Sequence, residues 1–180
     1  MAPYAAAVMG GAAGMPDAAR RGFLAGATAL GLALLAGCAE RKPYSAVGGP
    51  LPAFRLTDID GGEHAATDYS GIALVVNFWA TWCPPCRAEM PDLDRVHRRD
   101  EGRGPRVLGF CYDQDANPVK EFRLRTAVSF PLIIDRDHAL AKAIGVESYP
   151  TTLLVARDGR VTEVLVGPRP WPDYPGIAAL

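Results

Sequence analysis

An apolar run that leads into two closely spaced cysteines constrains this chain more than any other stretch. Residues 73–79 read ALVVNFW, with almost no polar alternation, which indicates a strand buried on both faces of a sheet. Cys83 follows at the position expected for a helix N-cap, and Pro84 stands at the first helical position, where its fixed φ suits a helix start. The segment therefore predicts a buried strand, a tight turn and a helix that begins directly after Cys83.

The two cysteines predict a redox dithiol. Cys86 lies three residues after Cys83, so a helix would bring the two sulfur atoms within disulfide reach. A thiolate at a helix N-terminus faces unpaired backbone N–H groups, and its pKa falls from about 8.5 toward neutrality. Cys83 is therefore the predicted nucleophile and Cys86 the resolving thiol. Half of a zinc site and a structural disulfide remain as alternatives, although His64, His97 and His138 are isolated in the sequence.

The N-terminal region predicts export. Arg20 and Arg21 precede an uncharged run at residues 22–37, which is short for a membrane span of about 20 residues but suits a signal-peptide core. The residues that end at Cys38 resemble a lipoprotein signal-peptidase box, so we expect lipidation of Cys38. An uncleaved anchor and an ordinary cleaved signal are the alternatives. All three place the rest of the chain outside the cytoplasm.

Composition and length predict one domain behind that signal. The sequence has 180 residues with 19 basic and 20 acidic side chains, and this balance gives no reason to expect nucleic-acid binding. We expect residues 1–38 to form the export segment. Residues 39–52, which are rich in proline and glycine, are expected to form a flexible tether, and residues 53–180 the domain.

The remaining elements follow from periodicity and turn composition. The predicted strands are residues 54–56, 63–66, 107–112, 132–134, 151–156 and 161–166, and the predicted helices run from Pro84 to about Asp100, over 117–126 and over 138–144. Alternating strands and helices indicate the α/β class. Cys111, inside one predicted strand, is interpreted as an inert core thiol rather than a third redox centre.

Several of these motifs carry a family resemblance. Residues 78–91 read FWATWCPPCRAEMP and resemble the active-site segment of the thioredoxin superfamily, specifically its membrane-anchored TlpA/ResA-like branch. Residues 54–62 resemble the leading hairpin of that branch, 119–131 its central insertion and 145–152 its cis-proline loop. The resemblance implies a thioredoxin-like fold, with a central mixed β-sheet flanked by helices, an N-terminal β-hairpin and a central insertion. Residues 171–180 are too short for the long final helix of that family.

The resemblance also implies the site. A cis bond before Pro150 would expose the Tyr149 backbone beside Cys83, where an extended client could pair with it. Client contacts are expected at Trp82, Pro84, Pro85, Tyr149, Pro150 and Thr151. Asn77 stands where thioredoxins carry a buried aspartate, and Glu89 is expected to replace that proton acceptor and to count with Cys83 and Cys86 as catalytic. The alternative for Glu89 is a solvent-facing helix carboxylate.

The function that follows is an extracytoplasmic, membrane-tethered thiol–disulfide oxidoreductase that reduces disulfides in exported proteins. By resemblance the clients would be apocytochrome c or copper-centre proteins. Such a reductant needs electrons from across the membrane, so a thiol transporter resembling CcdA or DsbD is implied. No cofactor or resident metal is expected. The alternatives are a copper-binding or metallochaperone module using Cys83, Cys86 and a histidine such as His138, and a peroxiredoxin-like peroxidase, against which Asn77 counts because proline is expected there.

The residues between the cysteines predict the redox poise. Pro84 and Pro85 remove the first two N–H donors of the helix, so only the Cys86 N–H remains well placed to stabilise a Cys83 thiolate. A strongly oxidising dithiol needs a very stable thiolate. We therefore predict a Cys83 pKa nearer neutrality than the acidic extreme, and a reducing dithiol.

Overall fold

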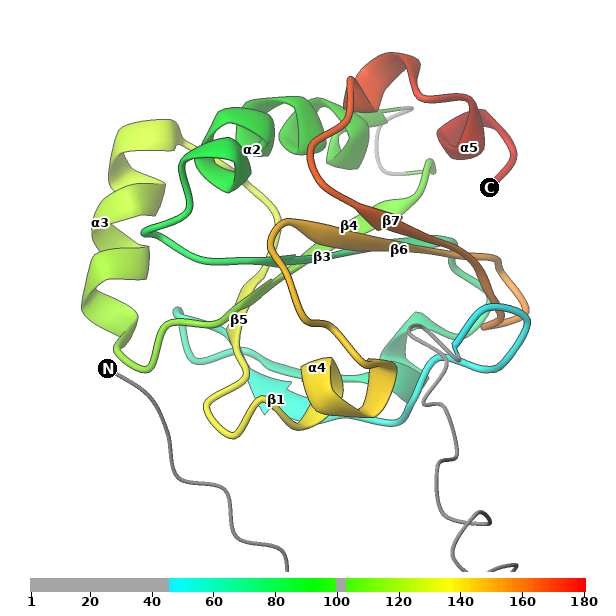
Figure 1. The fold of residues 1–180 in the computed structure, drawn as a ribbon, viewed down its shortest axis with the longest axis horizontal. Coiled ribbons are helices and arrows are strands. Elements are labelled where there is room, and N and C mark those ends of the chain that lie inside the picture. The colour runs from blue at the N-terminus through cyan, green and yellow to red at the C-terminus, as the bar shows by residue number, and fades with distance from the viewer. Residues whose placement is uncertain (1–45, 100–102) are drawn as a thin grey trace, which may run out of the picture. The chain divides into compact units, whose positions relative to one another are not determined.

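The computed structural model describes residues 46–99 and 103–180 (Figure 1). The predicted export segment, Cys38 and the first part of the predicted tether lie outside these residues. Within the described part of the chain, none of the helices is both long and apolar enough to cross a membrane.

A five-stranded mixed sheet forms the centre of the fold. Its strands, in spatial order, are β5 (Leu132–Ile134), β4 (Arg106–Cys111), β3 (Leu74–Trp79), β6 (Thr151–Val155) and β7 (Val161–Val166). The strands β3, β4 and β5 run parallel, whereas β6 is antiparallel to both β3 and β7. Every residue of β3 is buried, which confirms that the apolar run is a central strand.

Helices cover both faces of this sheet (Figure 1). The helices α2 (Pro84–His97) and α3 (Ala116–Thr126) pack on the face that receives Val75 and Trp79 of β3. The helix α4 (Ala139–Ile144) packs on the opposite face, with Leu74, Val76 and Phe78. Because side chains alternate along a strand, Asn77 lies on the same face as Val75 and Trp79, under α2. The α/β thioredoxin-like fold that the sequence predicts is thus observed.

The C-terminal residues return to the α2 face. A short 3-10 helix η3 (Trp171–Asp173) and the helix α5 (Pro175–Ala178) follow β7. Trp171 and Ile177 are buried in the same core cluster as the inner side of α2. Figure 1 shows this segment beside α2, above the sheet.

The N-terminal hairpin closes the β5 edge of the sheet. Its strands are β1 (Arg55–Thr57) and β2 (Glu63–Ala65), followed by the 3-10 helix η1 (Ala66–Tyr69). The backbone N–H of Ile59 donates to the Leu132 carbonyl at 3.0 Å. An uncovered edge strand would present free N–H and C=O groups, so this contact helps to protect the sheet.

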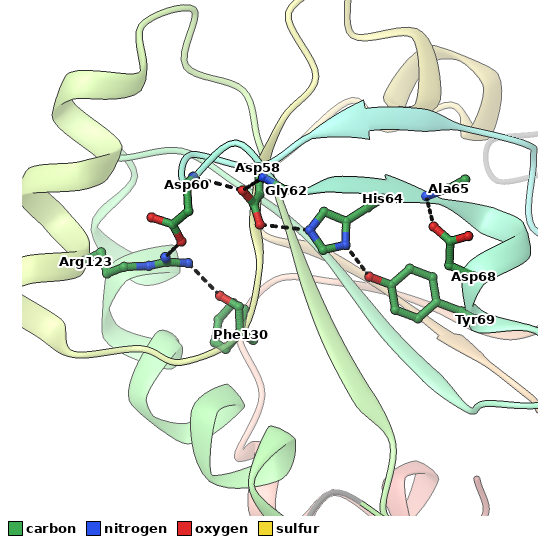
Figure 2. A network of polar contacts seen from close by, with 9 residues as sticks. All are labelled: Asp58, Asp60, Gly62, His64, Ala65, Asp68, Tyr69, Arg123 and Phe130. Carbon is green, nitrogen blue, oxygen red and sulfur yellow. Dashed lines mark hydrogen bonds and ion pairs between the residues drawn. The ribbon is translucent and has the colours of Figure 1, made fainter.

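A polar network holds the hairpin together (Figure 2). The Asp58 carboxylate accepts bonds from the backbone N–H groups of Asp60 at 2.9 Å and Gly62 at 2.8 Å, and its second oxygen lies 2.8 Å from His64 Nε2. A carboxylate only accepts, so His64 donates from Nε2, and its Nδ1 lies 2.6 Å from the Tyr69 hydroxyl.

Contacts of Arg123 join the hairpin turn to α3 (Figure 2). The Arg123 guanidinium forms an ion pair with Asp60, and its other terminal nitrogen donates to the Phe130 carbonyl at 2.9 Å. The hairpin is therefore attached both to the central insertion and to the sheet edge.

The predicted tether needs one correction. The backbone N–H of Gly48 donates to the Val161 carbonyl, and that of Leu51 to the Gly159 carbonyl, both at 2.9 Å. Residues 48–51 therefore pair with the turn between β6 and β7 rather than forming flexible chain, and the fold extends beyond the predicted start at Ala53. The glycine composition suggested flexibility, but here Gly48 adopts a φ of +83°, which glycine reaches at little cost.

Candidate active site

The cysteine pair stands at the junction of β3 and α2. Cys83 is the N-cap residue of α2, with Pro84 and Pro85 directly after it. The two sulfur atoms form a disulfide. Cys83 is 5 % exposed and Cys86 fully buried, so an incoming sulfur reaches only Cys83. The sequence-based placement of both residues is confirmed.

The N-cap supplies one donor to the Cys83 sulfur. The backbone N–H of Cys86 points to Cys83 Sγ at 3.4 Å. Proline has no N–H, so Pro84 and Pro85 offer none. The electrostatic support of a Cys83 thiolate at the start of α2 is therefore smaller than an ordinary helix N-terminus would give.

An exposed aromatic surface lies next to the cysteines. Trp82 is 62 % exposed, and its ring meets those of Tyr112 and Tyr149 edge to face at 6.3 and 6.1 Å. His138 stacks on Tyr112 at 3.8 Å between ring centroids. The bond between Tyr149 and Pro150 is cis, as expected. Large apolar rings beside a redox sulfur form a surface on which a polypeptide can bury apolar side chains.

The expected client-contact residues divide into two groups. Trp82, Pro84 and Pro85 are exposed and Tyr149 is half-buried, whereas Pro150 and Thr151 are buried. Thr151 pairs in the sheet with both Phe78 and Val166, and its hydroxyl donates to the Ser148 carbonyl at 2.7 Å. The sheet thus occupies both sides of Thr151, and a client contact at this residue stays a prediction.

A buried carboxyl group lies below the dithiol. Glu89 is 4 % exposed and stands three residues after Cys86, on the same side of α2. Its Oε1 accepts from Asn77 Nδ2 at 2.9 Å, and its Oε2 from the indole N–H of Trp171 at 2.8 Å. The alternative of a solvent-facing carboxylate for Glu89 is excluded by this burial.

The surroundings of Glu89 raise the pKa of its carboxyl group above the ordinary value. Burial raises the pKa of Glu89, while the hydrogen bonds from Trp171 and Asn77 oppose that rise. Asn77 Nδ2 also donates to Thr152 Oγ1 at 2.9 Å. A carboxyl group with a raised pKa can exchange a proton nearer to neutral pH, which is what a proton acceptor for a thiol requires.

Cys111 has the features of a core thiol. It is buried in β4, and its sulfur lies 3.1 Å from Asp113 Oδ2. Burial raises the pKa of Cys111, so the thiol stays protonated. This observation agrees with the interpretation of Cys111 as inert.

The described residues contain no group of three His, Cys, Asp or Glu side chains that is arranged to hold a metal ion. His138, the histidine considered for a copper site, instead contacts Tyr112 and has Nε2 at 2.9 Å from Gln114 Nε2. The copper-binding alternative therefore lacks a third ligand in the part of the chain that the structure describes.

Two members of the site were missed from the sequence, namely Trp171 and Thr152. Trp171 lies in a proline-rich stretch without periodicity, 82 residues after Glu89. Its only sequence signal is a large apolar ring in an otherwise polar segment. Thr152 was part of the recognised loop, but nothing local indicates that its hydroxyl contacts Asn77.

Comparison with known proteins identifies the family of this chain. Residues 46–180 match the family model Redoxin. The thiol-disulfide oxidoreductase ResA of Geobacillus thermodenitrificans is 36% identical over 139 residues, which cover 77% of this chain and 80% of that protein.

Solved structures give the same picture. A putative thiol:disulfide interchange protein DsbE from Chlorobium tepidum has a TM-score of 0.67 at 26% identity, over 72% of this chain and 94% of that one. A thioredoxin family thiol:disulfide interchange protein from Chlorobium tepidum TLS has a TM-score of 0.66 at 31% identity, over 72% and 93%.

Proposed function

Because this chain belongs to the Redoxin family and is a ResA-like thiol–disulfide oxidoreductase, we propose that it reduces disulfide bonds of exported proteins outside the cytoplasm. The observation that carries the proposal is the position of Cys83 and Cys86 at the start of α2, above the buried Glu89. Because the residues that end at Cys38 resemble a lipoprotein signal-peptidase box, we assign membrane attachment to lipidated Cys38 after removal of the export segment before it.

The proposed reaction has two exchange steps. The Cys83 thiolate attacks one sulfur of a client disulfide, a Cys83–client disulfide forms, and the other client sulfur leaves as a thiolate. The Cys86 thiol then loses its proton, and its thiolate attacks the Cys83 sulfur. The Cys83–Cys86 disulfide forms and the second client sulfur leaves as a thiolate. Two electrons have then passed from this protein to the client.

Glu89 is the proposed acceptor for the Cys86 proton. Cys86 is fully buried, so bulk water has poor access to its thiol. Glu89 lies one helical turn further along α2 and has a raised pKa, which brings its proton affinity closer to that of a thiol. In this role Glu89 replaces the buried aspartate of thioredoxins, whose position is occupied by Asn77 in this chain.

Client recognition is assigned to the exposed rim of the site. Trp82, Pro84, Pro85 and Tyr149 surround the entrance to Cys83, and the loop at Pro150 places Tyr149 there. An extended client segment would lie along this loop in the manner of an added strand. By family resemblance, the proposed clients are apocytochrome c or copper-centre proteins.

A reductant outside the cytoplasm must be reduced again after each turnover. The oxidised product of the reaction is the Cys83–Cys86 disulfide, which needs two electrons and two protons to return to the dithiol. We assign their supply to a membrane thiol transporter resembling CcdA or DsbD. The rim around Cys83 would meet the client and the transporter in turn.

The redox direction can be tested by equilibrium with glutathione and by titration of thiolate absorbance. The single N–H donor at Cys83 leads us to expect a Cys83 pKa near neutrality and a dithiol more reducing than the glutathione couple. A Cys83 pKa near ~4 together with an oxidising potential would overturn the assignment as a reductant.

The role of Glu89 can be tested in a single turnover. A symmetric chromogenic aryl disulfide releases one aryl thiolate when Cys83 attacks and a second when Cys86 resolves the mixed disulfide. In Glu89→Gln we expect an unchanged first phase and a second phase slower by about 100-fold at neutral pH. Asp92→Asn is the matched control, because Asp92 is on the same helix but pairs with Arg95 at the surface. An unchanged second phase in Glu89→Gln would remove Glu89 from the mechanism.

A further inference from the structure

We propose that Trp171 is a positioning residue for the redox reaction: its indole N–H fixes the Glu89 carboxylate below the dithiol and sets the pH range in which that carboxylate is ionised. The inference rests on the proposed role of Glu89. It assigns a function to the segment after β7, which neither the cysteine motif nor the proline loop includes.

Trp171 and Asn77 donate to different oxygens of the Glu89 carboxylate. Trp171 Nε1 lies 2.8 Å from Glu89 Oε2, while Asn77 Nδ2 contacts the other oxygen at 2.9 Å. Trp171 is fully buried. An indole nitrogen can only donate, so it bonds well to an ionised carboxylate and cannot accept the proton of a neutral carboxyl group.

The segment that carries Trp171 is anchored to the sheet. The Tyr174 hydroxyl donates to Glu163 on β7 at 2.7 Å, and Ile177 is buried at 4 % exposure. Gly176 allows the close approach of α5, since a Cβ there would lie 2.6 Å from the Leu154 side chain. The indole therefore keeps its place while Glu89 gains or loses a proton.

The groups around Glu89 determine how much the indole N–H contributes to the ionisation of its carboxyl group. Arg169, in the segment before η3, is the charge that acts on Glu89, and it lowers the pKa through its backbone N–H and its guanidinium. The two strands packed under α2 contribute the neutral side chains Asn77 and Thr152. On α2 itself, Cys86 and Asp92 each stand three residues from Glu89 and Arg87 two residues from it; the Arg87 side chain is exposed and that of Asp92 half-buried. The indole N–H is thus one of two side-chain donors that favour the ionised form.

The chain contains a matched control for the loss of an indole N–H. Trp79 is also fully buried and packs in the same core cluster. Its Nε1 has no hydrogen-bond partner among the described residues. Trp79→Phe and Trp171→Phe therefore remove the same atoms from the same core, but only the second removes a donor to Glu89.

The experiment measures the pH dependence of the second aryl-thiolate phase. In Trp171→Phe we expect its acid limb to move to higher pH by about one unit, which is a ten-fold lower rate on that limb. The first phase, which reports Cys83 attack, is expected to be unchanged. Trp79→Phe is expected to keep the wild-type midpoint. Trp171→Phe combined with Glu89→Gln is expected to match Glu89→Gln alone.

The outcomes separate this inference from the proposed function. A wild-type midpoint in Trp171→Phe, together with a slow second phase in Glu89→Gln, overturns the inference and leaves the role of Glu89 standing. An equal shift in Trp79→Phe also overturns it, because the effect would then come from lost packing. A normal second phase in Glu89→Gln overturns the proposed role of Glu89, and the inference with it.

A measurement on the unmodified protein avoids any folding defect of the variants. The three indole N–H groups give separate nitrogen-correlated NMR signals. The Trp171 signal of the reduced protein is expected to titrate with the midpoint of the second phase, and the Trp79 signal to stay constant. A Trp171 signal that does not change through that pH range would refute the inference.

Discussion

Glu89 is a buried carboxyl group and Asp58 a partly buried one, and their surroundings shift their pKa values in opposite directions. Burial raises the pKa of each. At Glu89 this effect exceeds the hydrogen bonds from Trp171 and Asn77. At Asp58 the donors prevail, namely His64 and the backbone N–H groups of Gly62 and Asp60, and the pKa is lowered.

The difference in pKa shift shows that the balance between burial and hydrogen-bond donors determines whether a carboxyl group stays ionised or can exchange a proton. Asp58 keeps 11% of its side chain exposed and accepts from three donors, namely His64 and the backbone N–H groups of Asp60 and Gly62 (Figure 2). It is a fixed anion that clamps a turn. Glu89 is more deeply buried, and its loss of hydration outweighs the donors Trp171, Asn77 and the Arg169 backbone N–H together with the charge of the Arg169 guanidinium. Glu89 can therefore exchange a proton, whereas Asp58 must stay ionised to hold the hairpin turn.

The largest effect is expected from Asn77→Asp, which places a second carboxyl group against Glu89. Asn77 Nδ2 and Glu89 Oε1 are 2.9 Å apart, and two carboxylates at that distance do not both ionise. We expect the acid limb of the second phase to rise by about two pH units, or ~100-fold in rate on that limb. Asn117→Asp adds the same charge at the start of α3 and serves as control. Identical profiles for the two variants would contradict the expected coupling.

The next effect concerns stability alone. Asp58→Ala removes the acceptor of two backbone N–H groups and of His64, and we expect the free energy of unfolding to fall by ~1–3 kcal/mol. Both aryl-thiolate phases should keep their rates, since the hairpin contacts the β5 edge and not the dithiol. Urea unfolding measures the loss. Glu63→Ala, which removes only an exposed partner of Arg55, should change stability by less than ~0.5 kcal/mol. A slower aryl-thiolate phase in Asp58→Ala would contradict the view that Asp58 serves stability alone.

The smallest effect is a difference in the pH dependence of stability. Between the ordinary pKa of 4.5 and its raised folded value, Glu89 binds more protons in the folded state, so the free energy of unfolding falls as pH rises. For Asp58, the unfolded chain binds more protons between the lowered folded value and 3.8, so stability is lost as pH falls through that range. Glu89→Gln should remove the first dependence and leave the second. The same slope of unfolding free energy against pH in the wild type and in Glu89→Gln above pH 4.5 would contradict the expected dependence.

Local sequence was sufficient for the part of the site that local structure builds. A buried β-branched run, a cysteine at the N-cap and a proline at the first helical position specify strand, turn and helix without distant contacts. The sequence therefore placed Cys83, Cys86 and their single N–H donor correctly. Helix and strand ends differ by only a few residues. For example, α2 ends at His97 rather than near Asp100.

The tertiary structure decided what surrounds those elements. Whether Glu89 faces solvent or core depends on partners 12 residues before it, at Asn77, and 82 residues after it, at Trp171. It also decided that residues 48–51 pair with the turn before β7 and that the sheet occupies both sides of Thr151. Helix and strand patterns report only which face is apolar, whereas the proton affinity of a buried acid depends on the few donors that the folded chain brings to it.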